Sequence, residues 1–417
     1  MRLFFPALAI LLLAGCAGSS SPSRPPASTQ TPAARAALVA PTVTPVPATT
    51  TPIPNRACQL FQSPDERAPF VQSASFVDGL HVFAFGYGLA QSGRINCAYL
   101  ARSDDGGQTW ARLPDRDLFL PSGEKPTDDV GSISGIAFAT QFDGWLYGPG
   151  LWSTYDGGQT WRDDSAAFTN VLTVSVSGGA AWLFDQVPCG AYECLRVSQA
   201  SAATDWRWSL LAAQPPAVSG APRHPVLRIT RPTATRALIT ALRGPDGAAR
   251  IVFTDDAGAT WQDLPSLPAG RGALFDIAAL GAREIWLTFT NSPATIMQGK
   301  EIYHSSDAGQ TWQLIADAGA GEPGKIDNLP LTGYLPRLTP VSSTTLFLSM
   351  GRSTLYASFD AGQTWAPVID DYASRGGADS VRLLGFGDAL HSLATSMSTR
   401  WVTADGGHTW TAVGLPR

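Results

Sequence analysis

Residues 103–110 read Ser-Asp-Asp-Gly-Gly-Gln-Thr-Trp, and the same pattern, [Ser/Thr]-x-Asp-x-Gly-x-Thr-Trp, recurs five more times in the 417-residue chain. The other copies occupy residues 154–161, 254–261, 305–312, 358–365 and 403–410. They end at Trp110, Trp161, Trp261, Trp312, Trp365 and Trp410, which are separated by 51, 100, 51, 53 and 45 residues. The interval of 100 is twice the others, so it contains a hidden repeat. Residues 198–206 keep a serine, a threonine and Trp206 at that place, which brings the number of repeats to seven.

The octapeptide has the residue types of a tight turn between two strands. An aspartate at its third position can accept hydrogen bonds from the N–H groups of its own turn, and a glycine at the fifth supplies a positive φ. Thr-Trp then begins the next strand, with the tryptophan closing over the turn. We therefore expect a structural role, rather than catalysis or calcium binding, for Asp105, Asp156, Asp256, Asp307, Asp360 and Asp405.

Short apolar stretches separated by turn residues precede each octapeptide at the same spacing. Examples are residues 136–138 with 145–147, 174–176 with 182–184, 277–279 with 285–287, and 338–339 with 346–348. A third strand leads into each octapeptide, as at 355–357, and a fourth leaves it. Four short strands per repeat without a helical period predict an all-β, seven-bladed β-propeller.

The octapeptide resembles the Asp-box, or BNR, repeat of sialidases, sortilin-type receptors and several glycoside hydrolases. The upstream strand ending in Asp143-Gly144-Trp145, in step with the octapeptide, resembles the photosystem II assembly and stability factor family, whose members are seven-bladed propellers. The resemblance extends from Phe70 to the C-terminus. The resemblance strongly indicates the architecture but says little about the activity, because propellers carry many unrelated functions. A photosynthetic role does not follow from it.

The N-terminal residues have the pattern of an export signal. Arg2 precedes an apolar run from Leu3 to Leu13, which is too short to span a bilayer, and Cys16 follows Leu13-Ala14-Gly15. This ending resembles the lipobox of bacterial lipoproteins, which implies cleavage after residue 15, a lipid on Cys16 and a lipid-anchored, extracytoplasmic protein. An ordinary signal peptide that contains a cysteine is the alternative. Residues 16–56, rich in Pro, Thr, Ser and Ala, are predicted to be an extended tether, and residues 57–417 the propeller.

Cys16 aside, the chain has four cysteines. In an oxidising compartment they are expected to form disulfides, and the short spacing favours Cys189 with Cys194 and hence Cys58 with Cys97. A zinc site is the weaker interpretation, because the histidines lack ligand spacing. We expect neither a metal nor another cofactor. The net charge of -5, without a basic stripe, argues against nucleic acid as a partner.

A propeller built outward from its innermost strand places the turns after strands one and three on one face, so the octapeptides lie there. The connections between blades lie on the opposite face and include the long stretches 114–131, 211–225, 315–336 and 369–379. Arg228, Arg337 and Arg382 each precede the first inward apolar residue of an innermost strand, and Asp276 has the same place in the fifth repeat. We expect them to gather at the channel mouth and to bind a carboxylate, a sulfate or an acidic loop of a partner. Alternatively, the arginines only pair with Asp276 and its neighbours.

A glycoside hydrolase of sialidase type is the alternative function. The arginine trio has a counterpart in sialidases, but the Arg-Ile-Pro signature of that family is missing near the start of the propeller. Glu322 and Tyr334 share one loop, and Asp128, Asp129, Asp327, Asp370, Asp371 and Asp379 lie near the loops, yet sequence spacing cannot place a catalytic carboxylate pair. No nucleophile motif is present. The sequence therefore favours a non-catalytic binding or assembly propeller that takes a protein, carbohydrate or other anionic ligand. It leaves open whether residues 58–61 complete a blade or only lead into the ring.

Overall fold

Alternating apolar residues and regularly spaced turns produce β-strands in every repeat of the described chain. The computed structural model describes residues 70–89, 95–114, 133–148, 150–168, 170–189, 192–216, 228–242, 249–293, 297–318, 326–369 and 380–415. Contacts divide the chain into two units, Met1–Ile53 and Pro54–Arg417, and all described residues belong to the second. No helix in the described ranges has the length and apolar character needed to cross a membrane.

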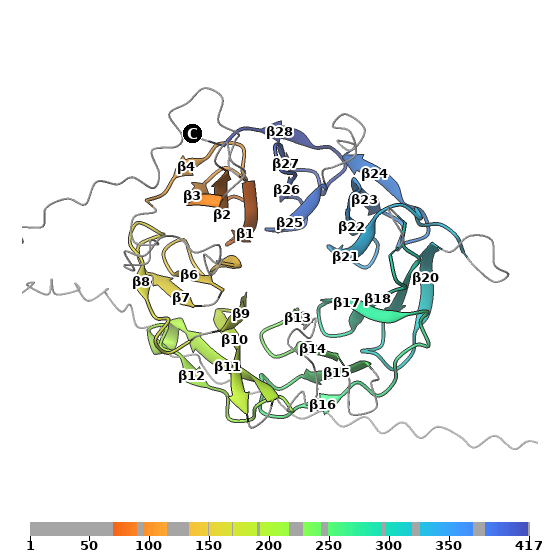
Figure 1. Cartoon of the computed structure of the whole chain (residues 1–417), viewed down its shortest axis with the longest axis horizontal. Coiled ribbons are helices and arrows are strands. Elements are labelled where there is room, and N and C mark those ends of the chain that lie inside the picture. The colour runs from red at the N-terminus through yellow and green to blue at the C-terminus, as the bar shows by residue number, and fades with distance from the viewer. Residues whose placement is uncertain are drawn as a thin grey trace, which may run out of the picture. The chain divides into compact units, whose positions relative to one another are not determined.

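Seven four-stranded antiparallel sheets surround a central axis, which confirms the predicted seven-bladed propeller (Figure 1). Blade 1 contains β1 (Phe70–Phe76), β2 (Val82–Leu89), β3 (Ile95–Ser103) and β4 (Ala111–Arg112). Blade 2 contains β5 (Gly135–Phe138), β6 (Gly144–Tyr147), β7 (Leu151–Thr154) and β8 (Arg162–Asp163). Blade 3 contains β9 (Val171–Ser177), β10 (Ala180–Cys189), β11 (Tyr192–Ser201) and β12 (Ser209–Leu210). Blade 4 contains β13 (Arg228–Thr230), β14 (Ala237–Leu242), β15 (Ala249–Thr254) and β16 (Gln262–Asp263). Blade 5 contains β17 (Ala273–Leu280), β18 (Glu284–Thr290), β19 (Lys300–Ser305) and β20 (Gln313–Ala318). Blade 6 contains β21 (Tyr334–Pro340), β22 (Leu346–Gly351), β23 (Leu355–Ser358) and β24 (Ala366–Ile369). Blade 7 contains β25 (Arg382–Phe386), β26 (Ser392–Thr395), β27 (Arg400–Thr403) and β28 (Thr411–Val413).

The octapeptide turns share one hydrogen-bond pattern, shown here for residues 254–261. The Thr254 hydroxyl donates to Asp256 Oδ1 at 2.7 Å and accepts from Gly258 N at 2.9 Å. Thr260 N donates to Asp256 Oδ1 at 2.9 Å, and the Thr260 hydroxyl donates to Oδ2 at 2.6 Å. The other five octapeptides repeat these four bonds. These aspartate oxygens therefore hold the turn closed.

Blade 3 closes its third turn differently. A 3₁₀ helix (Ala202–Thr204) leads to Asp205 and Trp206, both at positive φ, and Trp206 N donates to Ser201 O at 2.9 Å. Trp206 is buried and packs edge-on against Trp145 of blade 2, with ring centroids 5.3 Å apart. The repeat that lost its motif aspartate thus keeps the tryptophan as packing between blades.

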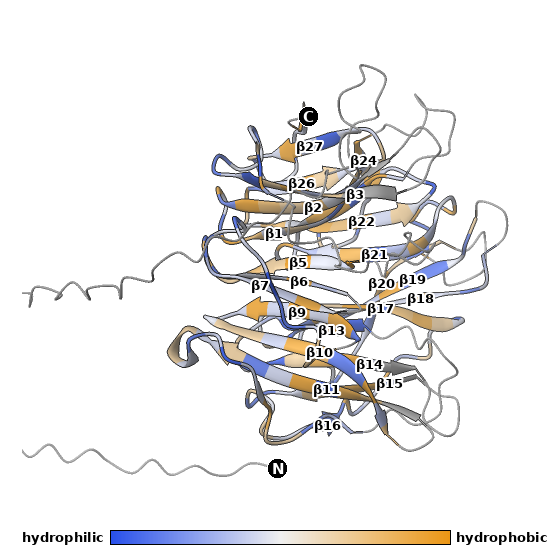
Figure 2. Ribbon diagram, turned by 60° about the vertical axis from the view of Figure 1, so that its left-hand side comes forward, coloured by the Kyte–Doolittle hydropathy of each residue, from blue (hydrophilic) through white to orange (hydrophobic). Residues whose placement is uncertain are grey.

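Two sets of turns meet on one face, which we call the octapeptide face; the opposite one is the loop face. The residue at the fourth octapeptide position donates its N–H to a carbonyl of the turn between the first two strands of the same blade, which we call the first turn. Examples are Gly106 N to Leu80 O at 2.9 Å and Ala308 N to Arg283 O at 2.9 Å. The expected side of the octapeptides is therefore correct. In Figure 2 the strands are largely hydrophobic and the turns that join them largely hydrophilic.

Apolar side chains between neighbouring blades form the core. Six clusters of buried residues each join two consecutive blades, from blades 1 and 2 through to blades 6 and 7. Within the described ranges no such cluster joins blade 7 to blade 1. Blades 1 and 7 nevertheless each have four consecutive strands of their own, so the ring closes by packing β1 against β25. Residues 58–61 lie outside the described residues.

Candidate binding site at the channel mouth

Arg228, Asp276, Arg337 and Arg382 occupy matching places on the innermost strands of blades 4 to 7. Each lies opposite a hydroxyl residue of the second strand, in the pairs Arg228↔Thr240, Asp276↔Thr288, Arg337↔Ser349 and Arg382↔Thr395. Arg228 and Arg382 begin β13 and β25, whereas Asp276 and Arg337 are the fourth residues of β17 and β21 and each follows a β-bulge. The four residues thus belong to the innermost strands of four successive blades around the central channel (Figure 1), and we call this group the arginine rim.

Asp276 links three of these blades. Arg228 Nε of blade 4 lies 3.4 Å from Asp276 Oδ1, and Leu338 N of blade 6 donates to Asp276 Oδ2 at 3.2 Å. The aspartate is 6% exposed. Burial raises its pKa to about 6, although Arg228 and Arg337 oppose this rise.

The three arginines lie close enough to influence one another. Burial, followed by repulsion from Arg337, lowers the pKa of Arg228, and the same two causes lower the pKa of Arg382. Arg337 is the exposed member and stands between the other two in blade order. In the described part of the chain, Asp276 is the carboxylate paired with this group. Asp276 attracts Arg228 and Arg337, whereas the charge that acts on Arg382 is that of Arg337.

The outer two arginines are fixed by aromatic rings and by backbone. The Arg228 guanidinium lies 5.3 Å from the centroid of the Phe275 ring, and that of Arg382 lies 5.1 Å from the Phe70 ring. Arg382 also donates from Nη2 to Val71 O at 3.4 Å, across the closure of the ring. These contacts orient the cations before any ligand is bound.

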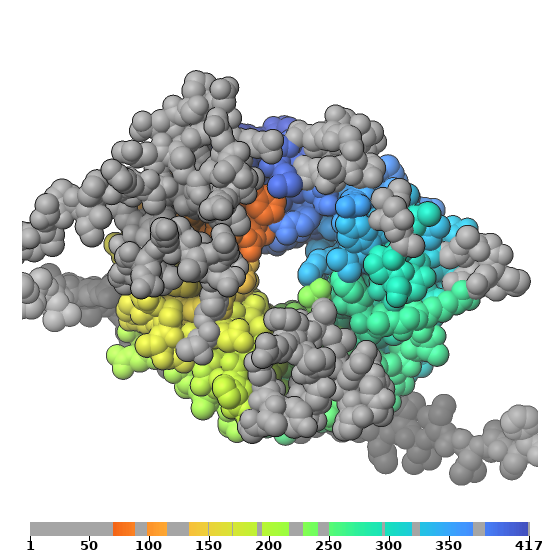
Figure 3. Space-filling model, in the orientation of Figure 1, coloured from red at the N-terminus to blue at the C-terminus, as the bar shows by residue number. Residues whose placement is uncertain are grey.

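The channel itself is hollow and polar. A cavity of about 620 Å³ lies among β1, β5, β9 and β25, and the hydroxyl residues along it include Ser73, Ser75, Thr173, Ser175 and Ser177. Figure 3 shows the opening at the centre of the ring.

Sequence reasoning missed a buried lysine that positions the segment before Arg337. Lys300 Nζ donates to the carbonyls of Pro330, Leu331 and Thr332 at 2.7, 3.3 and 3.2 Å. Burial lowers its pKa to about 8. The signal was present, because Lys300 is one of three lysines in the sequence. Because lysine is so rare in this chain, a lysine within a strand indicates a specific contact of its ammonium group.

Of the candidates for an enzyme, the described residues contain Asp327 and Tyr334. Glu322, Asp128, Asp129, Asp370, Asp371 and Asp379 lie outside them. Glu301 and Asp317 face each other on β19 and β20, but both are buried, and they accept hydrogen bonds from Arg271 N and Asp327 N, respectively. Tyr334 instead lies beside Arg352, 5.9 Å from ring centroid to guanidinium. Nor do the described residues contain a cluster of three or more His, Cys, Asp or Glu that could hold a metal.

One predicted disulfide is present, between Cys189 and Cys194 at the β10–β11 hairpin. Cys16 and Cys58 and the side chain of Cys97 lie outside the described residues, so the second pairing and the lipid site stay predictions.

The comparisons with known proteins concern the fold. Neither family models nor curated proteins match this sequence. Among solved structures, YCF48 bound to D1 peptide is 16% identical over 81% of this chain and 94% of that one, with a TM-score of 0.51. YCF48 from Cyanidioschyzon merolae is 13% identical over 81% and 96%, with a TM-score of 0.52. The GH74 xyloglucanase from Xanthomonas campestris is 18% identical over 82% of this chain and 53% of that one, with a TM-score of 0.53. At these identities the likeness shows a shared propeller fold.

Proposed function

We propose that this protein is a lipid-anchored, extracytoplasmic propeller that binds an anionic segment of a partner protein at the arginine rim and performs no catalysis. The observation that carries the proposal is the matching position of Arg228, Arg337 and Arg382 on three innermost strands, where the charge of Arg337 repels both Arg228 and Arg382. Guanidinium groups that repel one another, two of them half-buried, are stabilised by an incoming anion, and their planar donors suit carboxylates.

Two further points support a peptide as the ligand. The channel also holds a hydroxyl-lined cavity of about 620 Å³ among β1, β5, β9 and β25, which suits a chain with polar backbone groups. A propeller of the same fold, YCF48, has been solved with a peptide of D1 bound. The membrane anchor is supported by the Leu13-Ala14-Gly15-Cys16 sequence.

The rim is tested by titrating a fluorescein-labelled acidic peptide with a free C-terminal carboxylate and following anisotropy. We expect binding that weakens with salt and that falls at least about tenfold in R228A/R337A/R382A. Arg162→Ala is the control, because Arg162 is exposed and pairs with Asp164 at β8, the outermost strand of blade 2. Equal affinity in the triple variant would remove the arginine rim as the site.

The anchor and the enzyme alternative need separate experiments. C16S should move from the detergent phase to the aqueous phase in Triton X-114 partitioning, and unchanged partitioning would contradict a lipid on Cys16. Release of reducing sugar from xyloglucan or of sialic acid from a sialoside, lost in the arginine triple variant, would favour a glycoside hydrolase instead.

A further inference from the structure

Three neighbouring blades present a large apolar side chain to solvent at the same place on the octapeptide face. Leu390 of blade 7, Leu80 of blade 1 and Phe142 of blade 2 are 51%, 50% and 60% exposed. Their equivalence is structural, because each carbonyl accepts the N–H of the fourth octapeptide residue of its own blade. We call these three residues the apolar arc.

The other side of the ring uses polar residues at this place. The carbonyls that accept the same hydrogen bond in blades 4, 5 and 6 belong to Thr235, Arg283 and Thr344. The apolar choice is therefore not a requirement of the turn. Leaving an isolated apolar residue exposed is common, but a matched set on three successive blades indicates a binding surface.

The three blades of the apolar arc also share a glycine at the fourth octapeptide position; we call the first turn of each of these blades its tip. Their fourth octapeptide residue is Gly106, Gly157 or Gly406, and a β-carbon there would lie 3.2, 2.9 or 3.2 Å from the carbonyl oxygen of the residue before the arc residue. Blades 4 to 6 have Ala257, Ala308 and Ala361 instead. The hydrogen bond between the two turns nevertheless has nearly the same length, 2.9–3.0 Å, in all six blades.

Side chains hold the arc residues in place. Leu80 N and Leu390 N donate to Asp78 Oδ1 and Asp388 Oδ1 at 2.9 and 2.7 Å, and Phe142 N donates to the Thr140 hydroxyl at 3.1 Å. A rigid display lowers the entropy lost when a partner binds.

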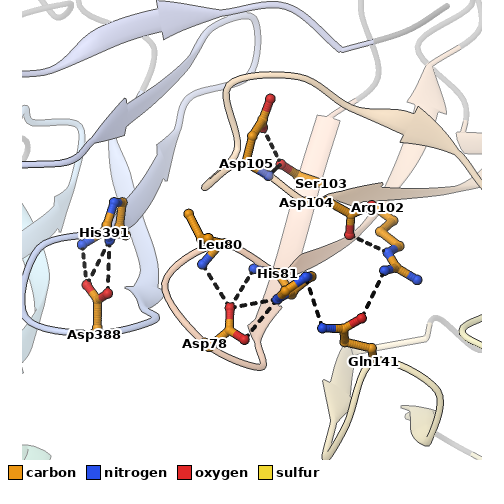
Figure 4. A network of polar contacts seen from close by, with 10 residues as sticks. All are labelled: Asp78, Leu80, His81, Arg102, Ser103, Asp104, Asp105, Gln141, Asp388 and His391. Atoms are coloured by element: carbon orange, nitrogen blue, oxygen red, sulfur yellow. Dashed lines mark hydrogen bonds and ion pairs between the residues drawn. The ribbon is translucent and has the colours of Figure 1, made fainter.

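Contacts between the tips make the arc continuous. The rings of His81 and His391 are held by Asp78 and Asp388, and His81 Nε2 lies 2.9 Å from Gln141 Nε2 of blade 2 (Figure 4). Gly79 of the blade 1 tip lies directly against Asp388 and His391 of the blade 7 tip. The three apolar side chains therefore stand on adjoining turns.

The surroundings of the arc are acidic. The side chains of Asp78, Asp104 and Asp388 are 51%, 61% and 45% exposed, and the cation beside them, Arg102, pairs with Asp104 at 2.7 Å. The octapeptide carboxylates of the same blades, Asp105, Asp156 and Asp405, add negative charge that hydroxyl and N–H groups hold. A second copy docked through the same arc would place like charges together, and so would an anionic membrane.

We propose that the apolar arc is a docking surface for a basic, amphipathic segment of a partner protein, whose apolar side chains cover Leu390, Leu80 and Phe142 while its Lys or Arg residues face the surrounding aspartates. Such segments bind by one apolar face, and opposite charge around that face fixes their orientation. This surface is built from first-turn residues, shares no residue with the arginine rim and does not depend on it.

The probe is a fluorescein-labelled synthetic peptide of about 18 residues, five helical turns, with Leu on one helical face and Lys on the other. We expect anisotropy to show binding at least about tenfold tighter than for a shuffled Leu/Lys peptide or a Leu/Glu peptide. L80S/F142S/L390S should lose about tenfold in affinity. The matched control T235S/R283S/T344S, at the equivalent places of blades 4 to 6, should bind as the wild type does.

Several results would overturn the proposal. These are wild-type affinity in L80S/F142S/L390S, equal binding of the shuffled peptide, or no binding of the Leu/Lys peptide. Two further results would also overturn it, because they would identify a different occupant. The first is self-association of the wild type in sedimentation equilibrium that L80S/F142S/L390S loses and the control variant keeps. The second is binding of the wild type to vesicles of phosphatidylcholine and phosphatidylglycerol that L80S/F142S/L390S loses and the control variant keeps. Far-UV circular dichroism and Tm of the variant verify its fold, which exposed substitutions should preserve.

Discussion

Gly79 and Asp388 touch across the closure of the ring, because a β-carbon at residue 79 would lie 2.0 Å from Asp388 Oδ2. The same position would lie 2.8 Å from His391 Nδ1, so any side chain there displaces the Asp388–His391 pair. This contact matters because no apolar cluster of the described residues joins blades 7 and 1. Small residues and polar contacts hold the ring closed at that point.

Gly79→Ala is therefore expected to lower the free energy of unfolding by about 1–3 kcal/mol, the usual cost of overpacking a tight contact. Urea denaturation followed by tryptophan fluorescence measures the change. Gly414→Ala is the control, since no atom lies within 4 Å of a β-carbon at residue 414. Equal stability of the two variants would show that the closure adapts to the added methyl group.

The fourth octapeptide position offers a test of backbone strain. Ala308 has φ 66°, in the left-handed region, where an L-residue with a β-carbon is disfavoured. Ala308→Gly should raise the free energy of unfolding by about 0.5 kcal/mol, because relief of strain outweighs the greater freedom of glycine when unfolded. The neighbouring substitution Gly309→Ala should do the reverse, because φ is 92° there and a β-carbon would lie 2.7 Å from Leu264 Cδ1. Urea denaturation measures both changes. A higher free energy of unfolding for Gly309→Ala than for Ala308→Gly would contradict this account.

Local and long-range features differ in how far the sequence reveals them. Each octapeptide closes through hydrogen bonds between residues two to four positions apart, so its turn and the number of blades could be predicted from the sequence. The closure contact of Gly79 with Asp388 joins the first blade to the last, and no local sequence pattern predicts this contact. The mutual proximity of the arginines was predictable because matching places on innermost strands share one rim.

The properties of the rim were not predictable in the same way. The pKa of Asp276 depends on burial between three blades, and the role of Lys300 depends on carbonyls about thirty residues away. The apolar arc was also missed, because Leu80, Phe142 and Leu390 lie outside the repeated octapeptide. Their equivalence appears only through the hydrogen bonds that their carbonyls accept.

The octapeptide carboxylates should contribute to acid sensitivity. Hydrogen bonds from the Thr260 hydroxyl and N–H, and then from Thr254, lower the pKa of Asp256 from 3.8 to about 2. A lowered pKa in the folded state means that the stabilisation is present above the unfolded value and is lost as the pH falls from about 4 to about 2. Asp256→Asn should therefore be less stable than the wild type at pH 7 and should lose less stability between pH 4 and 2. Urea midpoints at these three pH values measure the difference, and parallel losses in the two proteins would contradict the prediction.

Asp276 predicts the opposite pH dependence, both for stability and for binding. Its pKa of about 6 in the folded protein lies above the ordinary 3.8, so its contribution to stability is greatest below about pH 4 and is lost as the pH rises through 6. Protonation also removes the carboxylate that Arg228 faces and that attracts Arg337. Affinity for an acidic peptide should therefore rise as the pH falls from 7.5 to 5, while the peptide carboxylates stay largely ionised.

Asp276→Asn separates this effect from general charge changes. The amide cannot ionise, so the variant should bind the acidic peptide at pH 7.5 about as tightly as the wild type does at pH 5, and its affinity should be nearly constant over that range. Asp104→Asn removes one exposed carboxylate from the octapeptide face and should leave the wild-type pH profile intact. A wild-type profile that persists in Asp276→Asn would assign the pH dependence to another group and would separate Asp276 from the site. Loss of the profile only in Asp276→Asn would place the anion beside Arg228.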